Sequence, residues 1–316
     1  MVTQNRRSTE NTGLTIVRMR SLPAEIKIIT LLSARRFQTD LRVVYIALLF
    51  LLVCSTSLSA QENGLKSTNQ ATLLGVGNAF LTDTYLSPLE YSGLTMSLLH
   101  DRISPTRHFN EKLLLQQQFQ MQVAFTKNPS ASASEYFGEV SYTVNGLYPF
   151  FKNEKFRLFG GGGLDASLGG IYNVRNSNNP GSLKTSVNLD LSAMAIYNWR
   201  RFTFRWQVST PFLGMFFSPE YGQSYYEIFS LGNGKGTVRF ASFQNQLALR
   251  NYFTVDIPIN NFTIRTGYLG DYYRTDVNDI ITKIVSHQFV VGLVVESLNF
   301  GGFKAKDGKK FKSSYY

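Results

Sequence analysis

A two-residue alternation of apolar and polar side chains over residues 111–126 restricts the fold of this chain more than any other feature. One face carries Leu113, Leu115, Phe119, Met121, Val123 and Phe125, with Gln117 as the exception. The opposite face carries Gln116, Gln118, Gln120, Gln122 and Thr126. Alternate residues of an extended chain point to opposite sides, so the pattern predicts a β-strand. A strand of this kind suits a wall between lipid and a hydrated lumen, because about ten tilted residues cross a membrane.

The same alternation recurs along the chain. Clear runs occupy residues 136–148, 187–199, 202–209, 241–250 and 285–298, and weaker ones occupy 71–81, 91–103, 156–174 and 262–274. Together they predict ten antiparallel strands, or twelve if residues 218–237 contain a further hairpin. A soluble β-sandwich would also alternate, but its strands average about five or six residues. The predicted fold is therefore all-β: an antiparallel outer-membrane β-barrel of about ten strands, preceded by a cleaved signal peptide.

The predicted connections alternate in length. Residues 152–155, 200–201 and 258–261 form tight turns, whereas longer connections occupy 128–134, 175–185, 218–237 and 274–282. Short turns belong on the periplasmic side of such barrels and long loops on the outer side. Aromatic residues at strand ends are expected at the two membrane interfaces, and they include Tyr148, Phe150, Phe151, Trp199, Tyr272 and Tyr273.

The N-terminal region reads as a targeting segment. Arg42 precedes the apolar run 43–53, and small residues end at Ala60, which is the pattern of a Sec-type signal peptide. Cys54 is a weaker alternative as a lipidation site, because Val53 is a poor residue before a lipobox cysteine. The predicted organisation is an over-extended start at 1–34, a signal peptide at 35–60, a periplasmic segment at 61–70, the barrel at 71–300 and a basic tail at 301–316.

The net charge of +11 is concentrated near the two ends of the chain, so the barrel segment is close to neutral. Nucleic-acid binding is therefore not expected. Attraction of the tail to anionic headgroups is an alternative to simple solvation. The expected location is the outer membrane of a Gram-negative bacterium. The expected partners are outer-membrane lipids, lipopolysaccharide and the assembly machinery, and the oligomeric state stays open.

Ionisable residues of both signs fall on the inward phase of several strands. They are Glu139, Arg157, Asp165, Asp190, Arg205, Arg250, Arg265 and Glu296. Ten strands enclose a small lumen, so side chains of this size predict a polar network that narrows or plugs it. A selective small-solute channel and a binding or structural barrel both fit this arrangement.

An enzyme is the alternative class. His287 adjoins Ser286, but neighbouring strand residues point to opposite faces and cannot pair directly. These two are the weak catalytic candidates for an acyl hydrolase at the barrel rim. His100 and His108 are read as an interface residue and a solvated turn residue. The nucleophile and Asp-x-His signatures of barrel lipases and proteases are not found, and no metal or cofactor is expected.

Two segments predicted in outer loops, 87–93 and 218–227, share Ser-Pro, an acidic residue and tyrosines. Such side chains stack and form hydrogen bonds, so the segments either cap the barrel, which we favour, or present a surface for a sugar or a lipid headgroup. The candidates are Tyr85, Glu90, Tyr91, Tyr221, Tyr225, Tyr226 and Glu227.

These motifs carry a family resemblance. The signal ending Ser-Leu-Ser-Ala-Gln, the stretch Asp83–Gly93 and the stretch Ser218–Phe229 resemble the uncharacterised outer-membrane barrels of Bacteroidota grouped as domain of unknown function 3316. The resemblance covers residues 70–300 and implies location and fold, but no activity. One departure concerns the C-terminus, where Phe300 ends the last strand before a lysine-rich tail. The assembly machinery would then read an internal signal that ends at Phe300.

Overall fold

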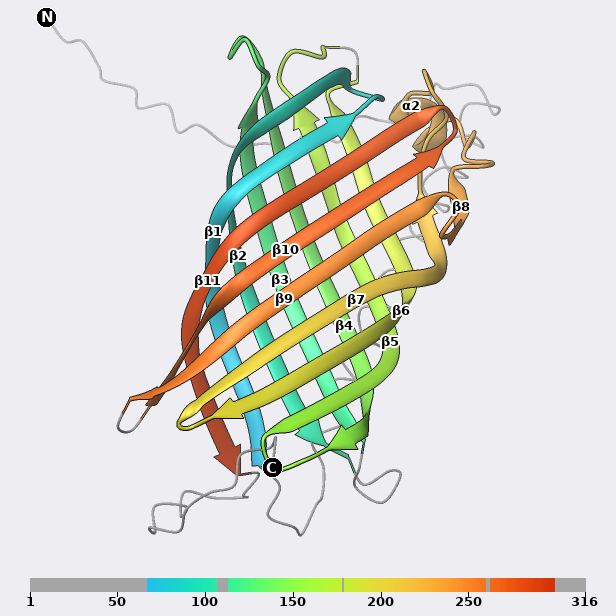
Figure 1. The fold of residues 1–316 in the computed structure, drawn as a ribbon. Coiled ribbons are helices and arrows are strands. Elements are labelled where there is room, and N and C mark those ends of the chain that lie inside the picture. Colours follow the sequence, from blue (N-terminus) through green and yellow to red (C-terminus); the bar gives the residue numbers. More distant parts are fainter. Residues whose placement is uncertain (1–66, 107–112, 178, 260–261, 299–316) are drawn as a thin grey trace, which may run out of the picture. The chain divides into compact units, whose positions relative to one another are not determined.

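The computed structural model describes residues 67–106, 113–177, 179–259 and 262–298. The predicted start, signal peptide and basic tail lie outside these ranges. The strands are β1 (Ser67–Asp83), β2 (Ser87–Pro105), β3 (Leu114–Lys127), β4 (Ser134–Lys152), β5 (Phe156–Asn173), β6 (Gly181–Trp199), β7 (Phe202–Phe217), β8 (Val238–Ser242), β9 (Gln246–Ile259), β10 (Phe262–Val277) and β11 (Ile280–Leu298). A short helix, α2 (Tyr225–Phe229), lies between β7 and β8 (Figure 1). No helix among the described residues has the length and apolarity needed to cross a membrane.

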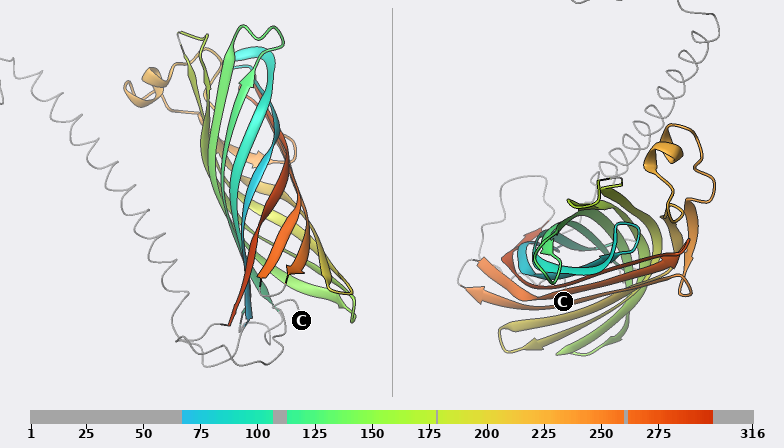
Figure 2. Two further views of the ribbon diagram at one scale, coloured as in Figure 1. Left: turned by 90° about the vertical axis from the view of Figure 1, so that its left-hand side faces the viewer. Right: turned by 90° about the horizontal axis from the view of Figure 1, so that it is seen from above.

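The ten long strands form one closed antiparallel sheet. Each long strand pairs with the next long strand in the chain. The short strand β8 follows β7 in sequence, but the long strand that pairs with β7 in the ring is β9. The last strand, β11, pairs with β1 from Ser67↔Leu298 to Asp83↔Thr282, which closes the ring. Viewed along the barrel, the strands surround a single lumen (Figure 2). The predicted ten-stranded barrel is therefore confirmed.

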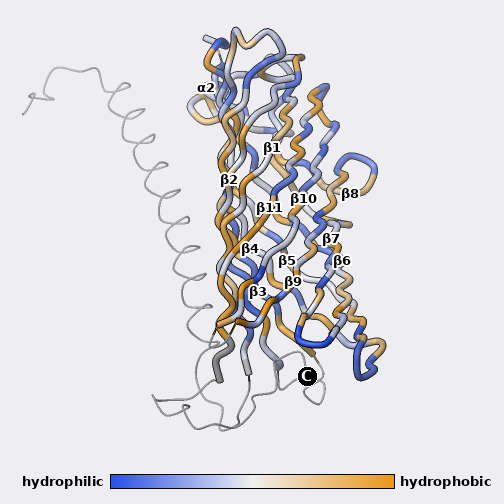
Figure 3. The backbone as a smooth tube through the Cα atoms, turned by 60° about the vertical axis from the view of Figure 1, so that its left-hand side comes forward, coloured by the Kyte–Doolittle hydropathy of each residue, from blue (hydrophilic) through white to orange (hydrophobic). Residues whose placement is uncertain are grey.

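The two faces of each strand follow the alternation in the sequence (Figure 3). On β3, Gln116 and Gln122 are buried in the lumen, whereas Met121 and Phe125 are 46% and 52% exposed on the outside. The same outward exposure of large apolar residues recurs around the barrel, for example at Leu164 on β5. A continuous apolar belt of this kind on a folded protein is stable against hydrocarbon rather than water.

The predicted single strand at 241–250 is wrong, because the chain divides there into β8 and β9. β7 pairs with β9 only up to Ser209↔Arg250, and its outer end pairs with β8 from Leu213↔Ser242 onward. Pro211 lies at the point of change, where it supplies no N–H for a ladder hydrogen bond. The pairing partner of β7 therefore changes from β9 to β8 near Pro211.

Two predicted loops are also shorter than expected. Residues 274–282 contain a two-residue turn at Asn278 and Asp279, whose φ angles are 60° and 59°, between β10 and β11. Positive φ at both central residues is the type I′ hairpin geometry, which Asn and Asp tolerate. The first hairpin turns at residues 84–86, so Glu90 and Tyr91 stand on β2 rather than in a loop.

This turn predicts a stability difference between two substitutions at one position. Asp279→Val should destabilise the folded barrel by about 1–2 kcal/mol, because a β-branched residue is strained at positive φ. Asp279→Gly should leave stability unchanged or raise it slightly, since glycine adopts this φ without a Cβ clash. The urea midpoint of the barrel in lipid vesicles measures both. Equal midpoints for the two variants would contradict the turn geometry.

Candidate functional site

Apolar clusters occupy both ends of the lumen. Near the outer rim, a cluster that includes Leu81, Tyr91, Phe137 and Ile284 fills the mouth. Toward the other rim, a second cluster includes Ile103, Leu114, Leu147, Phe159, Met194 and Ile196. Tyr273 packs against the outer cluster, so the prediction that it lies at the membrane interface is wrong: its position on β10 is in phase with the lumen-facing residues. Buried polar residues lie between these clusters and also beside them, as the Lys184–Asp83 ion pair does at the outer end.

A buried carboxylate joins strands across the lumen. Asp101 on β2 accepts from Arg205 Nη2 on β7 at 2.5 Å and from Arg265 Nη1 on β10 at 3.1 Å. Arg265 also binds Asp256 on β9, with its Nε 2.6 Å from the carboxylate. The Asp101, Arg205 and Arg265 side chains are at most 2% exposed. Breaking such a buried pair by removing one partner typically costs about 3–5 kcal/mol, so this network cannot open easily.

Glutamine side chains extend the network on the same level. Gln116 Nε2 on β3 donates to Asp101 Oδ1 at 2.9 Å and to Gln207 Oε1 on β7 at 2.8 Å. Gln207 Nε2 donates in turn to Ser192 on β6 at 3.0 Å. We call Asp101, Arg205, Arg265, Gln116 and Gln207 the lumen bridge. It connects β2, β3, β7 and β10 directly across the interior.

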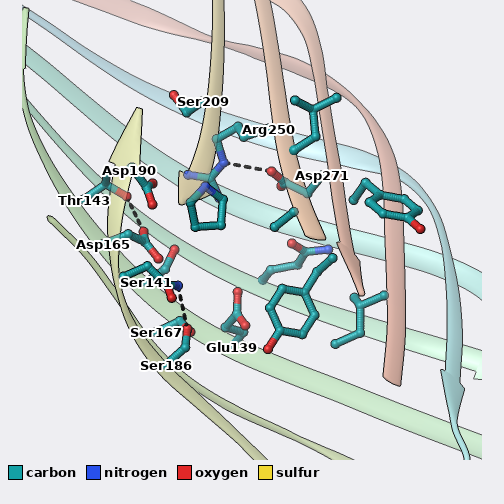
Figure 4. Close-up of a pocket in the computed structure, with 18 of the residues that line it drawn as sticks. Glu139, Ser141, Thr143, Asp165, Ser167, Ser186, Asp190, Ser209, Arg250 and Asp271 are labelled. Atoms are coloured by element: carbon teal, nitrogen blue, oxygen red, sulfur yellow. Dashed lines mark hydrogen bonds and ion pairs between the residues drawn. The ribbon is translucent and has the colours of Figure 1, made fainter. Parts of the chain in front are cut away.

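A small polar cavity lies in the lumen between the outer apolar cluster and the lumen bridge. Its volume is about 110 Å³, which holds a few water molecules or one small solute. Glu139 on β4, Asp165 on β5, Asp190 on β6, Arg250 on β9 and Asp271 on β10 all line it. Figure 4 shows these side chains around the same space, with Asp165 and Asp190 on one side and Asp271 on the other.

Carboxyl groups outnumber basic groups around this cavity. Arg250 Nε binds Asp271 Oδ1 at 2.8 Å, so these two opposite charges are paired. Thr143 donates to Asp165 Oδ1 at 2.6 Å, which orients that carboxyl group. Glu139 and Asp190 line the same space. Four carboxyl groups thus share the cavity with one guanidinium among the lining residues.

Several polar atoms at the cavity lack a partner. Among the residues that the structure describes, Asp190 Oδ1, Asn188 Oδ1 and Gln246 Nε2 are buried and make no hydrogen bond. All three residues line the cavity, and Asp190 is 8% exposed. Buried polar groups are almost always hydrogen-bonded in folded proteins, so these atoms indicate a place for water or ligand. Within the described ranges, no group of three His, Cys, Asp or Glu residues is arranged to hold a metal ion.

The tyrosines predicted in the outer loops divide into two groups. Tyr85 Oη donates to Gln223 O at 2.7 Å, and Leu183 N donates to Tyr225 Oη at 2.6 Å. Burial, together with the neighbouring Tyr225, raises the pKa of Tyr85 to about 12, so its hydroxyl stays a donor at neutral pH. Tyr221 and Tyr226 point away and are 67% and 66% exposed.

The other loop candidates have local partners. Tyr91 Oη accepts from Asn173 Nδ2 at 3.1 Å, and Glu90 binds Lys283 at 3.2 Å. Glu227 forms a capping box with Ser224 at the start of α2. The rings of Tyr85 and Tyr225 lie together, with centroids 5.8 Å apart. Glu90 lies on the outside of β2. Whether this group acts as a cap or a binding surface stays a prediction.

The histidines form no catalytic arrangement among the described residues. His287 lies on the outer surface, where its Nδ1 is 2.6 Å from Tyr268 Oη, and Ser286 points into the lumen, where it accepts from Gln288. His100 Nδ1 lies 3.0 Å from Thr72 Oγ1 on the outer face. His108 lies outside the described residues. The acyl-hydrolase alternative gains no support from these positions.

The predicted lumen residues are only partly brought together. Asp165, Asp190, Glu139 and Arg250 share the cavity, whereas Arg205 and Arg265 belong to the lumen bridge. Arg157 is buried near the start of β5, away from the cavity residue Asp165 on the same strand. The Glu296 side chain lies outside the described residues. The sequence analysis missed Asp101 and Asp256, although Asp101 is in phase with the lumen-facing Leu99 and Ile103.

Comparison with known structures finds similar chains at low identity. Similar chains include the outer membrane protease OmpT from Escherichia coli, with 7% identity, a TM-score of 0.39, and coverage of 74% of this chain and 97% of that one. The translocator domain of the autotransporter NalP from Neisseria meningitidis has 10% identity and a TM-score of 0.37, with 81% and 97% coverage. The toluene transporter TodX from P. putida has 9% identity and a TM-score of 0.28, with 78% and 92% coverage.

The curated proteins contain no match to this chain. The model of the family described as "Protein of unknown function (DUF3316)" matches residues 44–304, which include the whole described barrel. This match agrees with the resemblance drawn from the Ser-Pro and tyrosine motifs at 83–93 and 218–229. The chain belongs to this DUF3316 family, which is described as proteins of unknown function.

Proposed function

We propose that this chain is an outer-membrane barrel of a Gram-negative bacterium whose closed lumen binds a small organic cation. It would not act as an open diffusion pore. The observation that carries this proposal is the cavity that four carboxyl groups share with one guanidinium and in which Asp190 Oδ1 has no partner among the described residues. The excess of carboxyl groups sets the sign of the ligand, and the unpaired acceptor gives it a hydrogen-bonding site.

The lumen bridge supports the closed state. Asp101 holds both Arg205 and Arg265 across the interior, and Gln116 meets Gln207 beside them. A narrow ten-stranded barrel has little remaining cross-section once side chains of this size are linked. Solute would therefore reach the cavity only from the outer side, past the apolar cluster at the mouth.

The spacing of the carboxylates favours a polyatomic cation over a metal ion. No group of three potential metal ligands is close enough to coordinate one ion among the described residues. An alkylammonium group can donate three hydrogen bonds, and its apolar end can contact Phe137 or Tyr273, which also line the cavity. A cavity of about 110 Å³ limits such a ligand to a few non-hydrogen atoms.

The closed lumen predicts a silent planar bilayer. The unaltered barrel should give no current steps, and the double variant Asp101→Ala with Arg205→Ala should give brief, intermittent ones, because the apolar clusters at the two ends remain. This pair removes one charge of each sign and leaves the Arg265–Asp256 pair in place, so the lumen bridge is weakened without a net charge change. Single-channel recording measures both proteins.

The matched control removes an ion pair at the outer rim. Arg274 and Asp276 lie 3.6 Å apart and are about half exposed, so replacing both with Ala should leave the bilayer silent. Resistance of each barrel to unfolding by SDS at room temperature confirms that it is folded. Steady openings in the unaltered barrel would refute the closed lumen.

The cavity predicts selective stabilisation by an organic cation. Ethylammonium chloride should raise the thermal unfolding midpoint of the detergent-solubilised barrel more than sodium chloride at equal ionic strength. At about 100 times the Kd, one bound ligand stabilises the folded state by about 2.7 kcal/mol. Asp190→Asn should abolish most of this difference, because it removes the charge but keeps the shape.

Asp276→Asn serves as the control for a lost carboxylate outside the lumen, since Asp276 is exposed at the end of β10. It should retain the full ethylammonium effect. An equal loss in both variants would show that ethylammonium acts on the surface, and this result would refute binding in the cavity.

A further inference from the structure

An apolar groove lies on the outer surface of the barrel wall, separate from the lumen cavity. Its volume is about 1030 Å³, at the upper end of the ~300–1,000 Å³ typical of pockets for drug-sized ligands. The groove exists because Gly138 on β4 and Gly170 on β5 are paired neighbours that both point outward. A Cβ on Gly138 would meet no atom within 4 Å. The floor is strand backbone whose hydrogen bonds are already made within the sheet.

Aromatic side chains form the walls of this groove. Phe125 and Tyr136 lie on one side, with ring centroids 5.9 Å apart, and Tyr172 continues the wall on β5. Tyr226 of α2 contributes from the loop after β7 and is 66% exposed. The outward tyrosines Tyr136 and Tyr148 of β4 are separated by twelve positions, about the length needed to cross the apolar layer.

This spacing indicates the depth of the groove. Tyrosine rings are enriched at the two membrane interfaces, although Tyr142 lies on the same face between them, and Gly138 follows Tyr136 on the inner side of the outer ring. The floor of the groove at Gly138 and Gly170 therefore faces the hydrocarbon of the outer leaflet, while the part lined by Asn179 and Tyr226 extends outward toward the headgroups. No water is present at the depth of the floor, so acyl chains are the material that occupies it.

Positive charge lies at the outer end of the groove. Lys127 follows Phe125 on the same face of β3 and is exposed. Arg175 follows the end of β5, is also exposed, and reaches Ser132 in the loop between β3 and β4 at 3.5 Å. Glu135, the carboxylate beside them on β4, points into the lumen and is fully buried. Two cations thus stand above an apolar groove, and the exposed carboxylate of Glu90 on the adjacent strand β2 is paired with Lys283.

We propose that this groove is a binding site for a phosphorylated outer-leaflet lipid of the lipid A type, with an acyl chain over Gly138 and Gly170 and a phosphate on Lys127 and Arg175. Charge complementarity and membrane depth both select this occupant. A phosphate accepts charge-assisted hydrogen bonds from Lys and Arg, and the glycine floor lets a chain approach the sheet closely. The proposal requires the outer-membrane location but does not depend on ligand binding in the lumen.

Native mass spectrometry of the full barrel in detergent, with lipid A added at known concentrations, tests the site. Gly138→Leu places a side chain on the floor of the groove, and its Cβ meets no atom within 4 Å. It should weaken lipid A binding roughly tenfold, because it displaces acyl-chain methylenes that would otherwise be buried there. Lys127→Gln combined with Arg175→Gln should weaken it by a similar factor, since each cation near an anionic surface contributes separately. Phosphatidylcholine and phosphatidylglycerol are measured in parallel.

Matched variants at the opposite end of the barrel serve as controls. Ala193→Leu adds apolar bulk at an exposed, outward-facing position of β6 toward the other membrane depth, and Lys152→Gln with Lys155→Gln removes two exposed cations at the other rim. Both should bind lipid A as the unaltered barrel does. Unchanged binding by the folded Gly138→Leu protein, equal losses in the controls, or equal affinity for phosphatidylglycerol would each overturn the proposal.

Discussion

A sheet that crosses hydrocarbon must leave no backbone N–H or C=O group unpaired, and this constraint determines the rest of the structure. The chain meets it by pairing β11 with β1 along the whole length of β1. Closure then separates the two faces of every strand, so that apolar residues contact lipid and polar residues share a narrow lumen. Buried Gln, Asp and Arg side chains must satisfy one another there, and the lumen bridge is the result.

Much of the fold could be predicted because period two is a local property of the sequence. The predicted run 111–126 largely coincides with β3 at 114–127, and the predicted run 187–199 covers all but the first six residues of β6 at 181–199. The division between β8 and β9 could not be predicted in the same way, because partner choice along β7 depends on long-range register, and Pro211 is a weak local signal. The turn at Asn278 and Asp279 was read as a loop because these residues favour both loops and type I′ turns.

The site was predictable only in part, for a related reason. Strand phase correctly placed Glu139, Asp165, Asp190 and Arg250 inside, but it carries no information about height along the barrel. Strand stagger decides that Arg250 meets Asp271 while Arg205 meets Asp101. Asp101 was not predicted as a lumen residue, because its neighbours on the same face of β2, Leu99 and Ile103, are apolar. The lipid-side groove was invisible in the sequence, because it arises from two glycines brought together by the pairing of β4 with β5.

The seam between β1 and β11 also sets the order in which the barrel forms. Thr282 Oγ1 donates to Asp83 Oδ1 across 199 positions of the chain, so the first strand waits for the last one. Contacts this distant in sequence form slowly. Until β11 arrives, a partly paired sheet presents two long edges that can bind other chains. Assembly of this barrel therefore requires that both edges be shielded until the final strand is in place, and a chain cut before β11 would have no means of protecting them.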